Sequence, residues 1–258
     1  MNEEILINIT PQETRVALIQ QGSVQELQIE RTRQRGIVGN IYLAKVVRVL
    51  PGMQSAFIEI GLERTAFMHV ADITQSNPQP QIEKLLFEGQ TLLVQVLKDP
   101  LGTKGARLTT QLSIAGRNLV YLPPAGTDVA TEKYIGVSQR IDQPEEREAI
   151  KARLAGLMAD DEKGGIIVRT SAQDASDTEL QHDMHYLRTT WENIRETMKQ
   201  KAAPSLLYQD LSLAERVLRD VAGEETTQIR VDSAENFEKL KSFANLYMPN
   251  LLGKLTLH

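Results

Sequence analysis

The chain has 258 residues, of which 41% are hydrophobic and 24% charged, and its formal net charge is −5. This composition indicates a globular protein large enough for two domains, and the negative charge argues against a wholly basic nucleic-acid coat. The sequence has no cysteine, which excludes disulfides and cysteine-ligated zinc. No apolar run reaches the roughly 18 residues of a membrane span, so we expect a cytoplasmic protein.

The first 35 residues predict three β-strands joined by short turns. Apolar and β-branched residues dominate the stretches 4–9, 14–20 and 23–30, and the breaks between them contain Pro11 and Gly22. Strands joined by turns this short pair with their neighbours, so this segment predicts an antiparallel meander.

Residues 36–112 predict a small β-barrel. Strand-like runs lie at 40–50, 55–60, 64–69, 91–97 and 107–112. Phe57 and Phe67 are ten residues apart, one in each of two strands joined at Gly61. A five-stranded barrel with exposed aromatics and cations is typical of oligonucleotide-binding folds, where bases stack on the rings. The alternative is that both rings belong to the core, as aromatic side chains in strands commonly do.

A glycine-bearing turn with basic residues joins the last two of these strands. The segment 98–110 contains Lys104 and Arg107 together with Gly102 and Gly105. We expect this turn to hold both cations out toward solvent, where small neighbours allow an anionic backbone to approach. The alternative is an ordinary solvated hairpin.

Basic residues outnumber acidic ones between positions 30 and 70, although the whole chain is acidic. They are Arg31, Arg33, Arg35, Lys45, Arg48 and Arg64, against three glutamates. A basic face on an acidic protein can bind a polyanion locally, while the rest of the surface does not bind polyanions non-specifically. Lys45, in the first predicted barrel strand, is therefore a further candidate for contact with a polyanion.

The pattern changes to mixed α/β after a Pro- and Gly-rich joint at 122–127. Strands are predicted at 134–141 and 164–170, and helices at 144–159 and 176–201. The last part predicts helices at 211–222 and 236–247, the second capped by Ser233, and strands at 227–231 and from 254 onward.

Together with the first three strands, this last part gives the order β-β-β-α-β-α-β, which is that of a ribonuclease-H-like fold. Residues between 36 and about 210 would then be an insertion. Nucleases of that fold place an acidic residue in the first strand, where this chain has Asn8. We therefore expect this part to be a scaffold and not an active site.

Five motifs of the chain resemble the ribonuclease E/G family in order, spacing and identity. They are Ile37-Val-Gly-Asn-Ile-Tyr42, Leu50-Pro-Gly-Met-Gln-Ser-Ala-Phe57, Lys98-Asp-Pro-Leu-Gly-Thr-Lys-Gly-Ala-Arg-Leu-Thr-Thr110, Gly136-Val-Ser-Gln-Arg-Ile141 and Gly165-Ile-Ile-Val-Arg-Thr170. The resemblance covers the whole chain. It implies an α+β, multi-subdomain fold: a partial ribonuclease-H-like subdomain (1–35 and 211–258) interrupted by an S1 (OB-fold) β-barrel (36–118) and an α/β 5′-sensor (119–210).

The resemblance also implies roles for individual residues. It assigns Phe57, Phe67 and Lys104 to RNA contact on the barrel, which agrees with the aromatic and basic pattern there, and Lys45 and Arg107 extend that set. It matches Arg169 and Thr170 to the pair that binds a 5′-monophosphate, with the backbone around Val120 completing the pocket. An arginine offers phosphate a two-pronged donor, and a neighbouring hydroxyl adds one directed hydrogen bond. Without the resemblance, Arg169 and Thr170 would be an ordinary strand end.

The activity implied by the resemblance is magnesium-dependent endoribonuclease cleavage of single-stranded, often A/U-rich RNA. In this family the magnesium-binding aspartates lie in a deoxyribonuclease-I-like subdomain, and a Cys-Pro-x-Cys zinc link joins protomers. We expect this chain to end before that subdomain, with no catalytic residue and no metal ligand of its own. We expect single-stranded, 5′-monophosphorylated RNA as its partner, a homo-oligomer for the full-length protein, and a monomer or weak dimer for this fragment. The alternative is a stand-alone, non-catalytic S1-domain RNA-binding protein.

Overall fold

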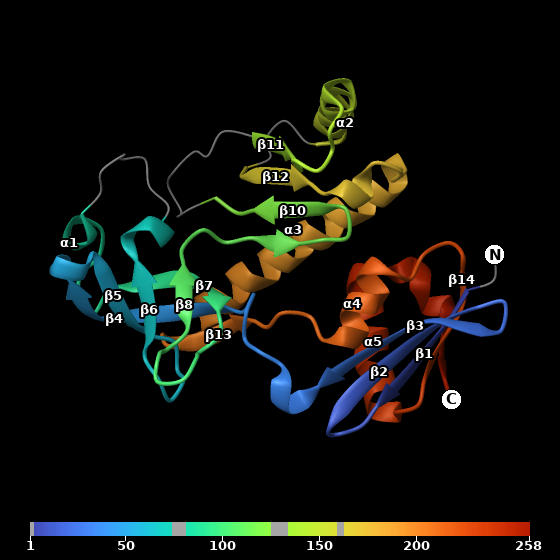
Figure 1. Ribbon diagram of the computed structural model, residues 1–258, viewed down its shortest axis with the longest axis horizontal. Coiled ribbons are helices and arrows are strands. Elements are labelled where there is room, and N and C mark those ends of the chain that lie inside the picture. The colour runs from blue at the N-terminus through green and yellow to red at the C-terminus, as the bar shows by residue number, and fades with distance from the viewer. Residues whose placement is uncertain (1–2, 74–80, 125–133, 159–162) are drawn as a thin grey trace. The chain divides into compact units, whose positions relative to one another are not determined.

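The computed structural model describes residues 3–73, 81–124, 134–158 and 163–258 (Figure 1). The chain divides into two compact units, one formed by Met1–Gly36 with Leu211–His258 and the other by Ile37–Asp210. Both units combine strands with helices, so the fold is α+β. None of the described helices is long and apolar enough to cross a membrane.

The discontinuous unit contains a five-stranded sheet in the order β15-β14-β1-β2-β3. Strands β1 (Glu3–Ile9), β2 (Glu13–Gln20) and β3 (Ser23–Arg31) are antiparallel, which confirms the predicted meander. Strands β14 (Thr226–Val231) and β15 (Leu255–Leu257) continue the sheet in parallel beside β1.

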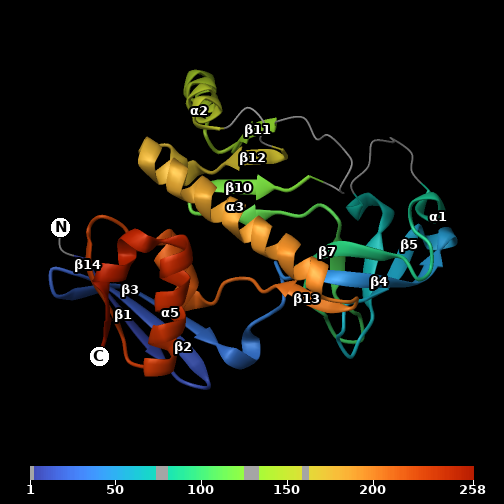
Figure 2. The same cartoon turned by 180° about the vertical axis from the view of Figure 1, so that it is seen from behind.

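Helices α4 (Leu213–Asp220) and α5 (Ala234–Tyr247) cover one face of this sheet, and Figure 2 shows them in front of it. Alternate residues of β1, among them Ile5 and Ile7, are buried beneath them, because side chains in a strand point to opposite faces in turn. Ser233 caps α5 as predicted, since its hydroxyl accepts the backbone N–H of Asn236.

The other unit contains a closed five-stranded barrel. Strands β4 (Ile41–Leu50), β5 (Ser55–Glu59), β6 (Ala66–His69), β8 (Arg107–Thr109) and β7 (Thr91–Lys98) pair in that order, and β7 pairs back onto β4. The β6–β8 contact is parallel and the others are antiparallel. A closed five-stranded barrel is consistent with the S1 or OB-like fold that was expected.

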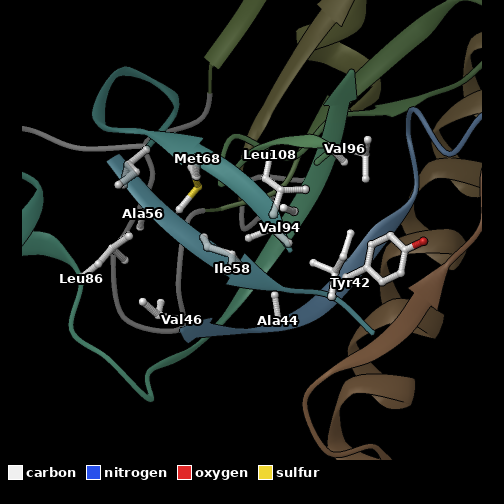
Figure 3. Packing of buried hydrophobic residues seen from close by; sticks show 14 of the residues in the cluster. Tyr42, Ala44, Val46, Ala56, Ile58, Met68, Leu86, Val94, Val96 and Leu108 are labelled. Atoms are coloured by element: carbon white, nitrogen blue, oxygen red, sulfur yellow. The ribbon is translucent and has the colours of Figure 1, made fainter. Parts of the chain in front are cut away.

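Apolar side chains, most of them small or branched, fill the barrel interior (Figure 3). They come from alternate positions of each strand: Tyr42, Ala44 and Val46 from β4, Ala56 and Ile58 from β5, Met68 from β6, Val94 and Val96 from β7, and Leu108 from β8. The residues between them on β5 and β6 therefore point away from the core, and these positions carry the candidate site.

Two short elements of the barrel region were not predicted. Helix α1 (Ile82–Leu85) lies between β6 and β7 in the sequence, and β13 (Ser205–Tyr208) pairs antiparallel with the first half of β4. Each has only four residues, too few for a helical or strand periodicity to be recognised.

A four-stranded sheet completes this unit, in the order β11-β12-β10-β9. The strands are β9 (Ile114–Ala115), β10 (Leu119–Leu122), β11 (Tyr134–Val137) and β12 (Gly165–Val168), and the helices are α2 (Pro144–Leu157) and α3 (Asp177–Gln200). Strand β11 is shorter than predicted because Arg147 on α2 donates hydrogen bonds to the carbonyls of Val137, Ser138 and Ile141, which hold the chain in a loop. Residue 159 of the predicted helix and residues 125–127 of the predicted joint lie outside the described residues.

Candidate nucleic-acid interface

A row of four side chains crosses the outside of the barrel, one from each of four neighbouring strands. The register pairs Arg48 on β4 with Phe57 on β5, Phe57 with Phe67 on β6, and Phe67 with Arg107 on β8. The neighbours Ala56, Ile58 and Met68 point into the core, so the row lies on the opposite side of the sheet. The outer surface thus has two aromatic rings flanked by two arginines, named here the aromatic row.

The two rings of the aromatic row contact each other edge to face. Their centroids are 6.4 Å apart and their planes make an angle of 63°. The Phe57 side chain is 38% exposed and Phe67 is half-buried, so neither belongs to the barrel core. The alternative that both rings are core residues is therefore wrong. A ring fixed by one neighbour but open on another side can accept a base in stacking contact.

Arg107 does not lie at the tip of the turn and does not extend freely into solvent, which corrects the expectation from its sequence. It is the first residue of β8, and its Nε and Nη2 donate to Oδ2 and Oδ1 of Asp72 at 2.9 and 3.0 Å. Asp72 is only 9% exposed, and a carboxylate this buried is costly without a cation. The hydrogen bond to Asp72 raises the pKa of Arg107 above its ordinary value. Arg107 therefore stabilises the buried carboxylate of Asp72 in addition to contributing charge to the outer face of the barrel.

Lys104 lies in the exposed turn between β7 and β8, as expected. Backbone hydrogen bonds between Leu101 and Lys104 close this turn, and Arg64 donates to the carbonyl of Gly102. A Cβ atom at Gly105 would lie 1.9 Å from the carbonyl oxygen of Thr65. Glycine is therefore required there for the turn to approach the start of β6, the strand that carries Phe67.

Lys45 is exposed on β4, next to the aromatic row and not in it. Its Cα partner across the β4–β5 pair is Glu59, which is also exposed. An exposed carboxylate opposite an exposed amine weakens the local positive field. The structure thus gives Lys45 a less favourable position for a polyanion than Arg48.

A second group of candidate residues surrounds the turn between β9 and β10. Arg169 follows β12 directly, and its backbone N–H donates to the carbonyl of Asn118 at 2.9 Å. Its Nη1 donates to the carbonyls of Gly116 and Arg117 at 2.5 and 3.1 Å. The guanidinium is therefore held against this turn.

Thr170 and Val120 lie close to Arg169 along the same pair of strands. Thr170 is the first residue of a short 3₁₀ helix, Thr170–Ala172, and is half-buried. Val120 on β10 pairs with Ile167 on β12, two residues before Arg169. The fold thus brings Val120 near Arg169 and Thr170, which follow it by about 50 positions in the sequence.

Two residues of these surfaces were not singled out from the sequence. Arg48 was counted only as part of the regional charge, although its alignment with Phe57 places it in the aromatic row. Asp183 on α3 accepts backbone hydrogen bonds from the β9–β10 turn, and no local pattern distinguishes it from a solvated helix residue. In the described parts of the chain, no three His, Asp or Glu side chains form a group that could hold a metal ion.

Comparison with known proteins decides the family. A sequence model described as the Ribonuclease E/G family matches residues 113–258, more than half of the chain. The chain belongs to the ribonuclease E/G family. It is 46% identical over 266 residues to ribonuclease G of Escherichia coli (strain K12), across 99% of this chain and 53% of that protein. Ribonuclease G of Haemophilus influenzae is 44% identical, across 99% of this chain and 52% of its own length.

The match extends to the longer branch of the family. Ribonuclease E of Haemophilus influenzae is 34% identical over 265 residues, which covers 99% of this chain and 28% of that protein. The chain spans about half the length of the ribonuclease G proteins it matches. Members of the family are ribonucleases, and this chain shares the part described above with them.

Proposed function

We propose that this chain is the RNA-recognition part of a single-strand-specific endoribonuclease that acts in RNA processing and decay. The observation that carries the proposal is the aromatic row, in which Phe57 and Phe67 lie side by side on the barrel between Arg48 and Arg107. Stacking on rings and attraction of the backbone by cations together bind single-stranded RNA with little dependence on its sequence.

The strand order of the barrel supports an S1 assignment for residues 36–118. In OB-like barrels, oligonucleotides bind across the second and third strands and the loop between the fourth and fifth. Here the second and third strands are β5 and β6, which carry the two rings, and the loop between the fourth and fifth carries Lys104. Phe57, Phe67 and Lys104 thus lie on the strands and the loop that bind ligands in such barrels.

We assign residues 119–210 to a 5′-sensor in which Arg169 and Thr170 bind the 5′-monophosphate of RNA beside the backbone of Val120. Both hydrogen bonds from the Arg169 side chain to the β9–β10 turn use Nη1. We assign its Nε–Nη2 edge to the phosphate, because that edge presents two parallel donors. The half-buried Thr170 beside it supplies a hydroxyl donor.

We infer that the discontinuous unit is a ribonuclease-H-like scaffold. Its sheet has the order expected of that fold, with three antiparallel strands followed by two parallel ones. The carboxylate of Asp232, just after β14, accepts hydrogen bonds from the side chain of Asn8 and from the backbone of Ile9 at 2.9 Å. A carboxylate engaged in this way ties two strands together. We assign magnesium and its aspartates to the part of the relatives that this chain does not span.

The test of the barrel compares Phe57→Ala and Phe67→Ala with Phe87→Ala. Each of the first two should weaken binding of single-stranded RNA by ~1–3 kcal/mol, the loss expected for one stacked base. Phe87 is 66% exposed and lies outside the aromatic row, so its replacement controls for loss of an exposed ring. Fluorescence anisotropy with a labelled oligonucleotide measures the affinity. Unchanged affinity together with a lowered melting temperature would return both rings to a structural role.

The same preparation tests whether recognition and cleavage are separate. We expect the 258-residue chain to bind 5′-monophosphorylated, A/U-rich RNA and to leave it intact when magnesium is present. A denaturing gel shows whether the RNA is cut. Site-specific cleavage that EDTA abolishes would contradict the assignment of magnesium to the remainder of the relatives.

A further inference from the structure

The turn between β9 and β10 is held from α3 by one buried carboxylate. Asp183 is 6% exposed, and its carboxylate accepts the backbone N–H groups of Arg117, Asn118 and Leu119 at 2.8, 2.8 and 2.7 Å. Successive N–H groups that converge in this way form an anion site, and here a side chain of the protein itself fills it. A buried carboxylate is stable only with such full hydrogen bonding.

The close approach of this carboxylate explains a glycine in the turn. A Cβ atom at Gly116 would lie 2.3 Å from Oδ1 of Asp183, far inside van der Waals contact. A larger residue would push either the turn or the carboxylate away. The turn and Asp183 therefore fit each other closely.

The other side of the same turn faces Arg169. The carbonyls of Gly116 and Arg117 accept from Nη1 of Arg169 at 2.5 and 3.1 Å, and Ser171 Oγ also donates to the carbonyl of Arg117 at 2.8 Å. Each of these carbonyls belongs to the same peptide group as an N–H that donates to Asp183. The carbonyl of Gly116 is joined to the N–H of Arg117, and the carbonyl of Arg117 is joined to the N–H of Asn118.

The two peptide groups thus connect Asp183 to Arg169. In a trans peptide the N–H and C=O point in opposite directions, so an acceptor at the N–H orients the C=O toward a donor on the other side. Hydrogen bonds linked in a chain also polarise one another, and a charged acceptor at one end strengthens the bond at the other. The negative charge of Asp183 therefore bears on the guanidinium through two rigid groups.

We propose that Asp183 is a positioning residue of the 5′-phosphate site, which orients Arg169 through the peptide groups Gly116–Arg117 and Arg117–Asn118. The proposal rests on the proposed function, because it takes Arg169 as the phosphate ligand. It predicts that the preference for a 5′-monophosphate over a 5′-hydroxyl depends on Asp183, although Asp183 does not contact the 5′ end of the RNA.

The test measures the ratio of the two affinities for one oligonucleotide prepared with either 5′ end. Asp183→Asn keeps the shape of the side chain but removes the charge and places an amide NH₂ against a backbone N–H. It should reduce the preference about tenfold, the scale of one lost charge-assisted hydrogen bond, while affinity for the 5′-hydroxyl RNA stays the same. Thr190→Val is the matched control, because Thr190 is buried on the same helix and donates only along it, to the carbonyl of Tyr186.

Two outcomes separate this proposal from the one it rests on. If the wild-type chain does not prefer the monophosphate, the phosphate site itself is wrong and the role of Asp183 falls with it. If the wild-type preference survives in a folded Asp183→Asn variant, only the positioning role is overturned. A loss of affinity that is equal for both RNAs also overturns it, because a purely structural role would give that result.

A measurement on the wild type covers the case in which the variant does not fold. A 5′-monophosphorylated dinucleotide should shift the amide resonances of Arg117 and Asn118 in ¹H–¹⁵N spectra, because phosphate binding redistributes the hydrogen bonds of Arg169. The 5′-hydroxyl dinucleotide should leave them in place. Binding of the monophosphate with both resonances unmoved would overturn the coupling.

Discussion

The aromatic row and the β9–β10 turn represent two opposite ways to build a ligand surface within one unit. In the aromatic row the ring of Phe57 is exposed, and its position follows from strand register alone. In the turn, a buried carboxylate from one side and Arg169 from the other fix the backbone polar groups of four successive residues, 116–119. The first surface has few directed hydrogen-bonding groups, whereas the second is held by directed hydrogen bonds on both sides.

This difference suits two different ligands. Every base presents a flat face, so a ring can accept many sequences without precise placement. A terminal phosphate instead needs donors at fixed positions. Donors that are oriented before the ligand arrives lose less conformational entropy on binding. We therefore expect substitutions at the row to act on all RNAs alike, and substitutions at the turn to act only on RNAs with a particular 5′ end.

The largest effect is expected from Arg169→Ala. Loss of a two-pronged, charge-assisted contact should weaken binding of 5′-monophosphorylated RNA by ~1.5–3 kcal/mol and leave the 5′-hydroxyl form nearly unaffected. Arg195→Ala, which removes an exposed arginine from α3, controls for the loss of positive charge. Isothermal titration with both RNAs measures the two affinities. Equal losses of affinity for both RNAs would show that Arg169 only attracts the RNA backbone. The proposed difference between the turn and the barrel surface would then be wrong.

The barrel was predictable from the sequence because strand alternation is a local signal. Inward residues such as Ala56 and Ile58 alternate with Phe57, and the ten-residue spacing of the rings placed Phe67 on the neighbouring strand. Arg48 shows where this signal fails. A bulge between Val46 and Arg48 shifts the register, so that Arg48 faces outward, whereas strict alternation would have placed it with Val46 in the core.

The polar partners could not be predicted in the same way, because they lie far apart in the sequence. Asp72 is 35 residues from Arg107, and its carboxylate changes Arg107 from a free cation into half of an ion pair. Asp183 is 64 to 66 residues from the turn that it holds. An acid in a helix commonly faces solvent, and only the packing of α3 against β9 and β10 determines that this one does not.

A smaller effect is expected from Ser176→Ala at the start of α3. The Ser176 hydroxyl accepts the backbone N–H of Glu179, and the Glu179 carboxylate accepts the backbone N–H of Ser176 at 2.8 Å in return. Loss of such a cap should lower the stability of this unit by about 1 kcal/mol. Urea unfolding followed by the fluorescence of Trp191, the single tryptophan, measures this loss on the same helix. The preference for a 5′-monophosphate should be retained, because the proposed link to Arg169 runs through Asp183 and not through the cap of the helix.

The acid dependence of this cap sharpens the same test. The backbone N–H of Ser176 is the main cause that lowers the pKa of Glu179. A lowered pKa stabilises the fold above the ordinary glutamate value of about 4.3, and this contribution is lost as the pH falls through the lower folded value. Because Ser176→Ala keeps this backbone N–H, the matching variant is Glu179→Gln, which removes the titrating carboxylate. The difference in stability between wild type and Glu179→Gln should shrink at pH values below about 4.3. A difference that is constant from neutral to acidic pH would contradict the role of the carboxylate.

The smallest effect is expected from Lys104→Ala, which tests the electrostatic part of the barrel surface. Lys104 lies in an exposed turn, so its amine should contribute about one phosphate contact and little to stability. For single-stranded RNA, one contact changes the slope of log K against log salt by about 0.7, or roughly 2–3-fold in affinity between 50 and 200 mM salt. Lys241→Ala, on α5 of the other unit, makes the same change of charge elsewhere. The affinities for the 5′-monophosphorylated and the 5′-hydroxyl RNA should fall equally in Lys104→Ala, because the β7–β8 turn contacts the RNA backbone and not its 5′ end. A loss confined to the monophosphate would mean that the barrel takes part in end recognition.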